Sequence, residues 1–322
     1  MIDCSSVFIQ MRDDKKKSVK RSFSLKAAIQ LAAPHTWPAA FLPVLLGSAL
    51  AYAGGASVNS WLLLTALATG ILLQAAVNTL NDYRDFVNGI DTAANCDDPT
   101  DAALIYECDD PRSVKIFGFS LLAAAAVLGA VLVYISGLGM LIYGGLAFLA
   151  IALYTLPGVN FSSLPLGELL SGTAMGCVLT CASYHAQAGG CSAETAILSI
   201  PAVLTIANIM LANNTSDIER DREGSRRTFP VCVGRGLAQT TLRLIIIITI
   251  IMVTLAAFIR FPGGLPIVPV LFIGTALAAY PLFTRPRTPD VRAESMRCIL
   301  AAHKWTIASY IAVIMLHCIT QG

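Results

Sequence analysis

Charged residues are scarce in this sequence of 322 residues. They make up 13% of the chain, whereas a soluble domain usually carries about 25%. Hydrophobic residues reach 56% and the mean hydropathy is +0.69, which argues against a disordered chain and against an ordinary soluble enzyme. The net charge of only +2 leaves no general basic excess with which to bind nucleic acid. The composition therefore indicates an integral membrane protein with several spans.

Cysteine and histidine form no recognisable site. The nine cysteines include no CxxC pair, so a disulfide framework is not indicated. Cys177 and Cys181 share one helical face within an apolar run, which is typical of small packing residues. The four histidines lack the spacing of metal ligands, and none is assigned a metal role.

Nine apolar runs are candidates for helices that cross a bilayer, which requires about 20 mostly apolar residues each. The sequence therefore predicts an all-α integral membrane protein with about nine transmembrane helices. The runs are 37–53, 61–80, 114–135, 138–156, 166–186, 195–212, 242–259, 265–283 and 305–320.

The charged residues orient these nine spans. With the N-terminus in the cytoplasm, every Lys and Arg except Arg260 lies on the cytoplasmic side, as membrane proteins require of their short loops. The outer connections hold a single acidic residue, Glu194. Residues 1–32 are predicted to be a basic cytoplasmic tail, and residues 33–322 the transmembrane domain. We expect a multi-pass protein of the cytoplasmic membrane whose active site faces the cytoplasm.

Polar motifs follow the second and the sixth apolar runs. The first reads NTLNDYRDFVNGID (78–91), and Asn78, Asp82 and Asp85 share one face if the helix continues past the apolar run. The second reads NNTSDIERDREGSRRT (213–228), where Asp217 and Asp221 have i, i+4 spacing. A single acidic pair at a helix end is usually only solvated. Two such clusters on one side of the membrane favour a shared site.

The chemistry of these residues suggests a bound diphosphate. Mg²⁺ prefers oxygen ligands and is typically held by one or two carboxylates together with substrate phosphates. Arg226 and Arg227 follow the second cluster and can donate charge-assisted hydrogen bonds to phosphate oxygens. A membrane enzyme with this site would use a lipid diphosphate, whose departure from an allylic chain leaves a carbocation. The alternative is a transporter or lipid-binding protein, in which Asp82 and Asp217 can be neutralised without loss of function.

These motifs resemble those of the UbiA superfamily of intramembrane prenyltransferases. The first motif of that family is typically NDxxDxxxD, and the second is DxxxD followed by Gly and a basic–Thr pair. Here the first motif reads NDYRDFVNGID, with its last Asp at 91. This form resembles the menaquinone branch, as do the segments PHTWPAAFLPVLLG (34–47), YTLP (154–157) and LPLGE (164–168). The resemblance runs from about residue 33 to the C-terminus and implies a UbiA-type bundle with cytoplasmic cap loops.

The resemblance also implies roles for single residues. The implied metal ligands are Asp82, Asp85, Asp217 and Asp221, and Asp85, Asp221 and Tyr154 are the implied catalytic residues. The implied substrate-binding residues are Asn78, Arg84, Asp91, Asn214, Glu168, Arg226 and Arg227. Three alternatives stay open. Tyr154 is equally an anchor at the membrane interface, Glu168 a cap of the fifth helix, and Arg84 a partner of an adjacent Asp.

Two segments depart from the menaquinone branch. Ala33 stands where that branch usually has an Arg, so a contact to an acidic acceptor is either absent or supplied elsewhere. Residues 95–110 are unusually acidic where relatives have a neutral loop with glycines, which would change the cap over the site or the acceptor.

The expected reaction is Mg²⁺-dependent transfer of a polyprenyl group from its diphosphate to an aromatic acceptor within the bilayer. The expected acceptor is 1,4-dihydroxy-2-naphthoate, which gives demethylmenaquinone with loss of CO₂ and diphosphate. The alternatives within the superfamily are 4-hydroxybenzoate, haem, a chlorophyll precursor and a glycerol lipid. No nucleic-acid partner is expected, and neither the chain length nor the oligomeric state is indicated.

Overall fold

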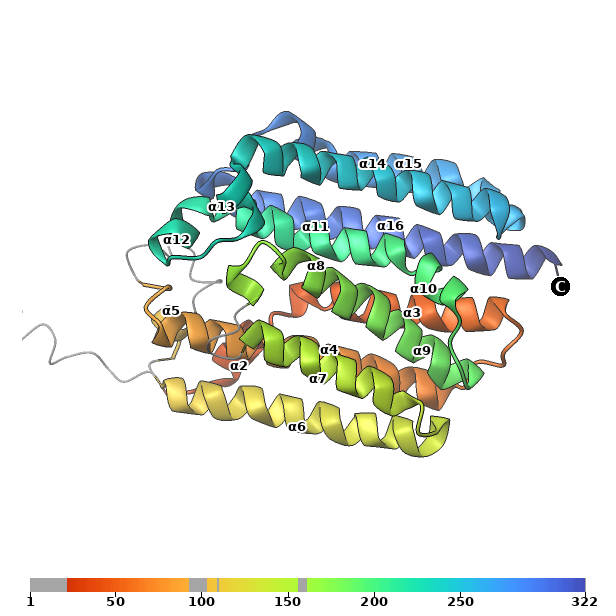
Figure 1. Cartoon of the computed structure of the whole chain (residues 1–322), viewed down its shortest axis with the longest axis horizontal. Coiled ribbons are helices and arrows are strands. Elements are labelled where there is room, and N and C mark those ends of the chain that lie inside the picture. The colour runs from red at the N-terminus through yellow and green to blue at the C-terminus, as the bar shows by residue number, and fades with distance from the viewer. Residues whose placement is uncertain (1–21, 93–102, 109, 156–160, 322) are drawn as a thin grey trace, which may run out of the picture.

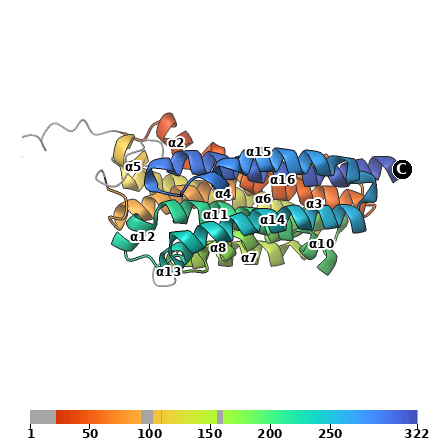
Figure 2. The ribbon, with the colours of Figure 1, turned by 90° about the horizontal axis from the view of Figure 1, so that it is seen from above.

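The helices of this chain are seen in a computed structural model that describes residues 22–92, 103–108, 110–155 and 161–321. The described residues contain helices and no β-strand. The long helices lie side by side in one bundle (Figures 1 and 2). They are α3 (Pro38–Ala53), α4 (Ser60–Val87), α6 (Pro111–Ser136), α7 (Met140–Thr155), α9 (Leu179–Ala188), α11 (Ile200–Ser216), α14 (Arg235–Ile259), α15 (Val268–Thr284) and α16 (Arg292–Gln321).

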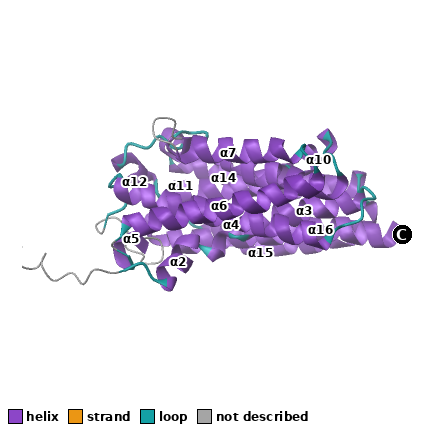
Figure 3. Cartoon of the chain, turned by 90° about the horizontal axis from the view of Figure 1, so that it is seen from below, coloured by secondary structure: helices purple, strands orange, loops and turns teal. Residues whose placement is uncertain are grey.

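The short helices and loops gather at the two ends of the bundle (Figure 3). One end carries the polar motifs and four short helices, α2 (Leu25–Ala32), α5 (Ala103–Tyr106), α12 (Ile218–Glu223) and α13 (Phe229–Val233). The C-terminus lies at the opposite end (Figure 1). There Arg260 and Glu194, which the sequence assigned together to the outer side, form an exposed ion pair of 2.8 Å between Nε and Oε1.

The expected all-α membrane architecture is confirmed, whereas the number of nine spans is not. Six helices in the described part of the chain are long and apolar enough to cross a membrane, or seven if one bent pair counts as a span. The fourth run corresponds to α7, which has only 16 residues. The fifth is divided into α8 (Gly167–Gly172), the π-helical η3 (Thr173–Val178) and α9.

The bent pair is formed by α2 and η1 (Pro34–Thr36) with α3, and its angle is 49°. Ala33 sits at the break with a φ of 46°, and Pro34 follows it. Proline lacks an N–H and therefore ends the hydrogen-bond ladder of α2. One carbonyl that loses its helical partner at the break, that of Ala32, accepts a hydrogen bond of 2.8 Å from Trp37 Nε1. The last eight residues of the predicted basic tail are thus helical, and residues 1–21 of that tail lie outside the described part.

Glycines let the interrupted fifth span approach α11 closely. A Cβ on Gly172 would lie 2.6 Å from the Val203 oxygen, and a Cβ on Gly176 would overlap the Val203 nitrogen. Two small residues four positions apart are typical of closely packed membrane helices. The helix α11, which leads into the second motif, is largely buried.

Candidate active site

The first motif lies at the end of α4, which continues beyond its apolar run to Val87. Asp82 and Asp85 therefore belong to the helix, as the spacing predicted. Gly89, with a φ of 70°, turns the chain after the helix. The turn brings Asp91 back, because the Ile90 and Asp91 amides both donate to the Asp85 carbonyl, at 2.9 and 3.2 Å.

The second motif does not simply continue α11. That helix ends at Ser216, and Asp217 (φ −100°, ψ 15°) joins it to the short helix α12. The second motif is therefore not one continuous helix, but Asp217 and Asp221 keep their i, i+4 geometry, since the Asp221 amide donates to the Asp217 carbonyl at 2.8 Å. Asp217 and Asp221 are both buried.

Arg226 connects the two motifs. One of its guanidinium nitrogens, Nη2, donates to both carboxylate oxygens of Asp85 at 2.7 Å. The other, Nη1, lies 3.5 Å from Asp221 Oδ1. Asp221 Oδ2 accepts a further hydrogen bond of 3.0 Å from the Thr228 hydroxyl. A turn through Ser225, whose φ is 56°, places Arg226 between the motifs, and the two acidic clusters are joined by a shared cation.

A second arginine makes a similar connection. Arg220 Nη2 donates to Asp217 Oδ2 at 2.6 Å, and its Nη1 lies 3.6 Å from Asp91 Oδ1. Asp82 interacts electrostatically with this cluster, namely with Asp85, Asp91 and Arg220. The sequence motif contained Arg220 but gave no reason to select it, because an arginine three residues after an aspartate also fits an ordinary exposed helix pair.

A third arginine of the cluster comes from the last helix of the chain. Arg292, at the start of α16, lies 2.9 Å from Asp217 Oδ1 through Nε and donates from Nη2 to Asn213 Oδ1 at 2.9 Å. Nothing near Arg292 in the sequence forms a motif, so the sequence did not point to it. Asp217 thus has a guanidinium at each of its carboxylate oxygens.

Arg84, which belongs to the first motif, also contacts Asp85. Its Nη2 lies 3.2 Å from Asp85 Oδ1, and it donates to the Ser162 hydroxyl and the Asn81 side-chain oxygen at 2.9 and 2.8 Å. Its Nη1 donates to the Tyr154 carbonyl at 2.9 Å. In this structure Arg84 pairs with the adjacent aspartate, which is one of the two roles left open by the sequence.

The remaining predicted residues lie around this cluster. The Tyr154 phenol interacts electrostatically with Arg226, Arg84 and Asp85. Asn214 donates to Glu168 Oε1 at 2.8 Å, while the buried Glu168 Oε2 finds no hydrogen-bond partner among the residues that the structure describes. Glu168 also stands in the first turn of α8, so both of its proposed roles remain compatible with its position.

Asn78 contacts the broken span instead of the carboxylates. It donates to the Thr36 hydroxyl at 2.9 Å, and Gln74, one helical turn away, donates to the same oxygen at 3.3 Å. The sequence missed Thr36 and Gln74; a glutamine within an otherwise apolar run was the available signal. Arg227 is separated from the cluster, since its side chain is exposed and its amide donates to the Ser163 carbonyl at 2.8 Å.

The donor set fits Mg²⁺ in its chemistry, because five aspartates supply only hard oxygen ligands. In this structure, however, aspartate side chains of the cluster form ion pairs with arginines. In the described residues, no three His, Cys, Asp or Glu side chains stand in an arrangement that holds a metal ion. Arg220 and Arg226 each bridge two of these aspartates, so a metal ion would compete with them for the carboxylate oxygens. We call this cluster of aspartates and arginines the carboxylate site. It consists of Asp82, Asp85, Asp91, Asp217, Asp221, Arg84, Arg220, Arg226 and Arg292.

Burial disfavours the charged form of the acids in the second motif. Burial raises the pKa of Asp217 to about 7, although the neighbouring Arg220 opposes this change. Burial also raises the pKa of Asp221, and Arg226 opposes that change. Charged carboxylates in this environment need a cation nearby, which the arginines supply and which a metal ion would supply equally well.

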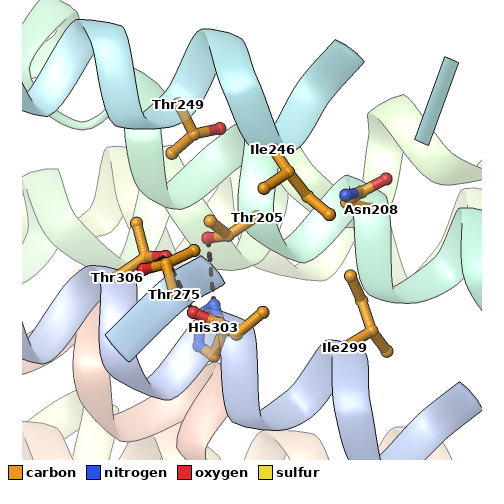
Figure 4. Close-up of a pocket in the computed structure, with 9 residues that line it drawn as sticks. Thr205, Asn208, Ile246, Thr249, Thr275, Ile299, His303 and Thr306 are labelled. Carbon is orange, nitrogen blue, oxygen red and sulfur yellow. Dashed lines mark hydrogen bonds between the residues drawn. The ribbon is translucent and has the colours of Figure 1, made fainter. Parts of the chain in front are cut away.

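A separate polar cavity within the bundle is too small for a substrate. It has a volume of about 10 Å³ and is lined by α11, α14, α15 and α16 (Figure 4). His303 Nδ1 lies 2.9 Å from the Thr205 hydroxyl, and its Nε2 lies 3.3 Å from the Pro38 carbonyl oxygen. This space is about that of one water molecule. These two contacts hold the histidine ring in place.

Together, the helical bundle and its paired acidic motifs define an intramembrane prenyltransferase. The UbiA prenyltransferase family model matches residues 40–307, and the chain belongs to this family. It is therefore an enzyme of the prenyltransferase class and a multi-pass membrane protein.

Relatives of known sequence agree with this assignment. The chain is 34% identical over 214 residues to a 1,4-dihydroxy-2-naphthoate octaprenyltransferase of Bacillus subtilis, which covers 66% of this chain and 68% of the relative. It is 30% identical over 258 residues to UbiA prenyltransferase domain-containing protein 1 of Rattus norvegicus, with 77% of this chain and 74% of the relative covered.

Solved structures share the fold. A UbiA homologue from Archaeoglobus fulgidus, bound to GPP and Mg²⁺, matches with a TM-score of 0.61 at 19% identity, covering 90% of this chain and 99% of the other. A digeranylgeranylglyceryl phosphate synthase matches with a TM-score of 0.57 at 16% identity, covering 90% and 98%. At these identities the likeness concerns the fold alone.

Proposed function

We propose that this enzyme transfers a polyprenyl group from polyprenyl diphosphate to 1,4-dihydroxy-2-naphthoate, with Mg²⁺ as its cofactor, on the cytoplasmic face of the cytoplasmic membrane. The observation that carries the proposal is the meeting of the two acidic motifs through Arg226, at one end of the bundle. The naphthoate is favoured as acceptor by the form of the first motif and by the similarity to the Bacillus subtilis enzyme.

In this reaction the allylic C–O bond breaks and the electron pair leaves with the diphosphate. Bound Mg²⁺ would neutralise the charge that develops on that leaving group. Asp82, Asp85, Asp217 and Asp221 are the residues that would hold the metal. Arg226, which pairs with Asp85 and Asp221 here, would donate charge-assisted hydrogen bonds to the diphosphate oxygens.

The acceptor completes the reaction by carbon–carbon bond formation. The ring carbon that bears the carboxylate attacks the allylic cation, and its two hydroxyl groups enrich the ring in electrons. The C–CO₂⁻ bond then breaks, its electrons restore the aromatic ring, and CO₂ leaves. The product is the reduced form of demethylmenaquinone. Tyr154 interacts with Arg226 and Asp85, so its ring would stand beside the cation, where a π-face is stabilising.

The test is a reconstituted reaction in liposomes with a polyprenyl diphosphate, Mg²⁺ and 1,4-dihydroxy-2-naphthoate, and product detection by mass spectrometry. We expect the prenylated, decarboxylated product from the wild type and none after EDTA. Asp82→Asn and Asp217→Asn should abolish product formation, while Asp290→Asn, an exposed aspartate outside the carboxylate site, should retain it. Product with 4-hydroxybenzoate or another acceptor, but none with the naphthoate, would refute the acceptor and keep the family reaction.

A further inference from the structure

The charges of the carboxylate site suggest what its arginines do during catalysis. When all five aspartates of the site are ionised, they carry five negative charges: Asp82, Asp85, Asp91, Asp217 and Asp221. Four arginines carry four positive charges: Arg84, Arg220, Arg226 and Arg292. The metal-free site is therefore close to neutral, which is what a largely buried cluster requires.

The same balance can be worked out for the loaded site. A diphosphate ester adds three negative charges, and if it binds together with two Mg²⁺ ions, these would add four positive ones. With all four arginines in place the loaded site is neutral. Without them it would keep four negative charges, which a buried environment disfavours strongly. The arginines must therefore remain in the site when substrate binds, although their carboxylate partners turn to the metal.

Of the four arginines, Arg292 is the one whose change of partner can best be followed from the contacts in the structure. Both oxygens of Asp217 are engaged here, Oδ2 by Arg220 at 2.6 Å and Oδ1 by Arg292 at 2.9 Å. A metal ion at Asp217 would compete with these two guanidinium groups for the carboxylate oxygens. Arg220 also lies near Asp91, whereas Arg292 is anchored to the neutral Asn213 at 2.9 Å. This anchor holds the guanidinium at the site after it has released Asp217.

We propose that Arg292 is a further substrate-binding residue, which pairs with Asp217 in the metal-free enzyme and binds the diphosphate of the polyprenyl substrate in the loaded enzyme. It reaches the site from α16, so the last helix takes part in holding the leaving group together with the two motif-bearing elements. This inference rests on the proposed diphosphate chemistry and is independent of the acceptor.

The proposal predicts two changes of opposite sign in Arg292→Gln. Without diphosphate, the variant should bind Mn²⁺, detected by electron paramagnetic resonance, about tenfold more tightly, because Asp217 has lost a competing cation. With Mg²⁺, it should bind farnesyl thiolodiphosphate, an unreactive analogue, about tenfold more weakly in calorimetry, because a charge-assisted hydrogen bond to the ligand is gone. Arg292→Lys should lie between the wild type and Arg292→Gln in both measurements.

Arg297→Gln is the matched control, since Arg297 is an exposed arginine of the same helix. It should behave as the wild type in both assays. A purely structural role for Arg292 would lower the melting temperature and weaken both affinities together, and that outcome would overturn the proposal. Unchanged analogue binding in Arg292→Gln would overturn it as well. A tenfold loss of analogue binding in an enzyme that turns over no naphthoate would support the role of Arg292 and refute only the proposed acceptor.

Discussion

Arg226→Gln should destabilise the metal-free protein and make it more responsive to Mg²⁺. Arg226 and Asp85 have side-chain exposures of only 11% and 7%, and removal of one partner of such a buried pair costs about 3–5 kcal/mol. Arg84 stays 3.2 Å from Asp85 and compensates part of the loss, so the lower end, about 3 kcal/mol, is expected. At about 2 °C per kcal/mol for a chain of this size, the melting temperature should fall by about 6 °C.

Intrinsic tryptophan fluorescence during heating in detergent measures this change. Saturating Mg²⁺, at about a hundred times its Kd, adds about 2.7 kcal/mol to the folded state. The Kd of the wild type already includes the free energy needed to displace Arg226. At one Mg²⁺ concentration, equal for both proteins, the rise in melting temperature should therefore be larger in the variant, which binds Mg²⁺ more tightly. The double variant Asp85→Asn/Arg226→Gln should recover stability, because both partners of the pair are neutral.

The control is Arg222→Gln, an exposed arginine on α12, which should melt as the wild type does. An equal Mg²⁺ response in wild type and Arg226→Gln would refute the reasoning, since it would show that the metal does not compete with Arg226. A double variant that is no more stable than Arg226→Gln would refute the attribution of the loss to Asp85.

Three further changes test other parts of the structure. Gly176→Ala should lower the melting temperature by an amount equivalent to about 1–3 kcal/mol because of overpacking, whereas Gly129→Ala, where a Cβ meets nothing within 4 Å, should not lower it; equal effects would contradict the packing. Thr36→Val deprives the Asn78 amide of its acceptor and should cost about 1–3 kcal/mol in thermal unfolding, and an unchanged melting temperature would contradict that bond. Glu168→Gln can keep the bond that Oε1 accepts, so we expect an unchanged melting temperature and at least about tenfold slower turnover in the liposome assay; full activity would leave Glu168 as a helix cap.

The fold and the two motifs were predictable because their signals are local. Apolar runs give helices, and the i, i+4 spacing of Asn78 and Asp82 marks one helical face whatever the neighbouring elements do. The number of spans was less predictable. The sequence does not reveal that a π-helical segment, residues 173–178, interrupts the fifth span, or that α7 ends after 16 residues. Both features depend on how these helices pack against their neighbours.

The arginines of the carboxylate site show the opposite case. Arg226 could be selected since it follows the second motif closely in the chain. Arg292 could not, because it lies 2.9 Å from Asp217 only through the packing of α16 against α11. A single arginine at the start of a helix has no local pattern that distinguishes it from Arg297, which is exposed. The charge balance of a buried site is a property of the assembled bundle.

The two motif-bearing elements, α4 and α11 with α12, meet at one end of the bundle. A diphosphate that enters and leaves through this end never passes the apolar length of the protein. The enzyme therefore has no need of the alternating inward- and outward-facing states on which carriers of charged solutes depend. If the proposed reaction is correct, substrate binding and diphosphate release both take place at this end, next to the carboxylate site.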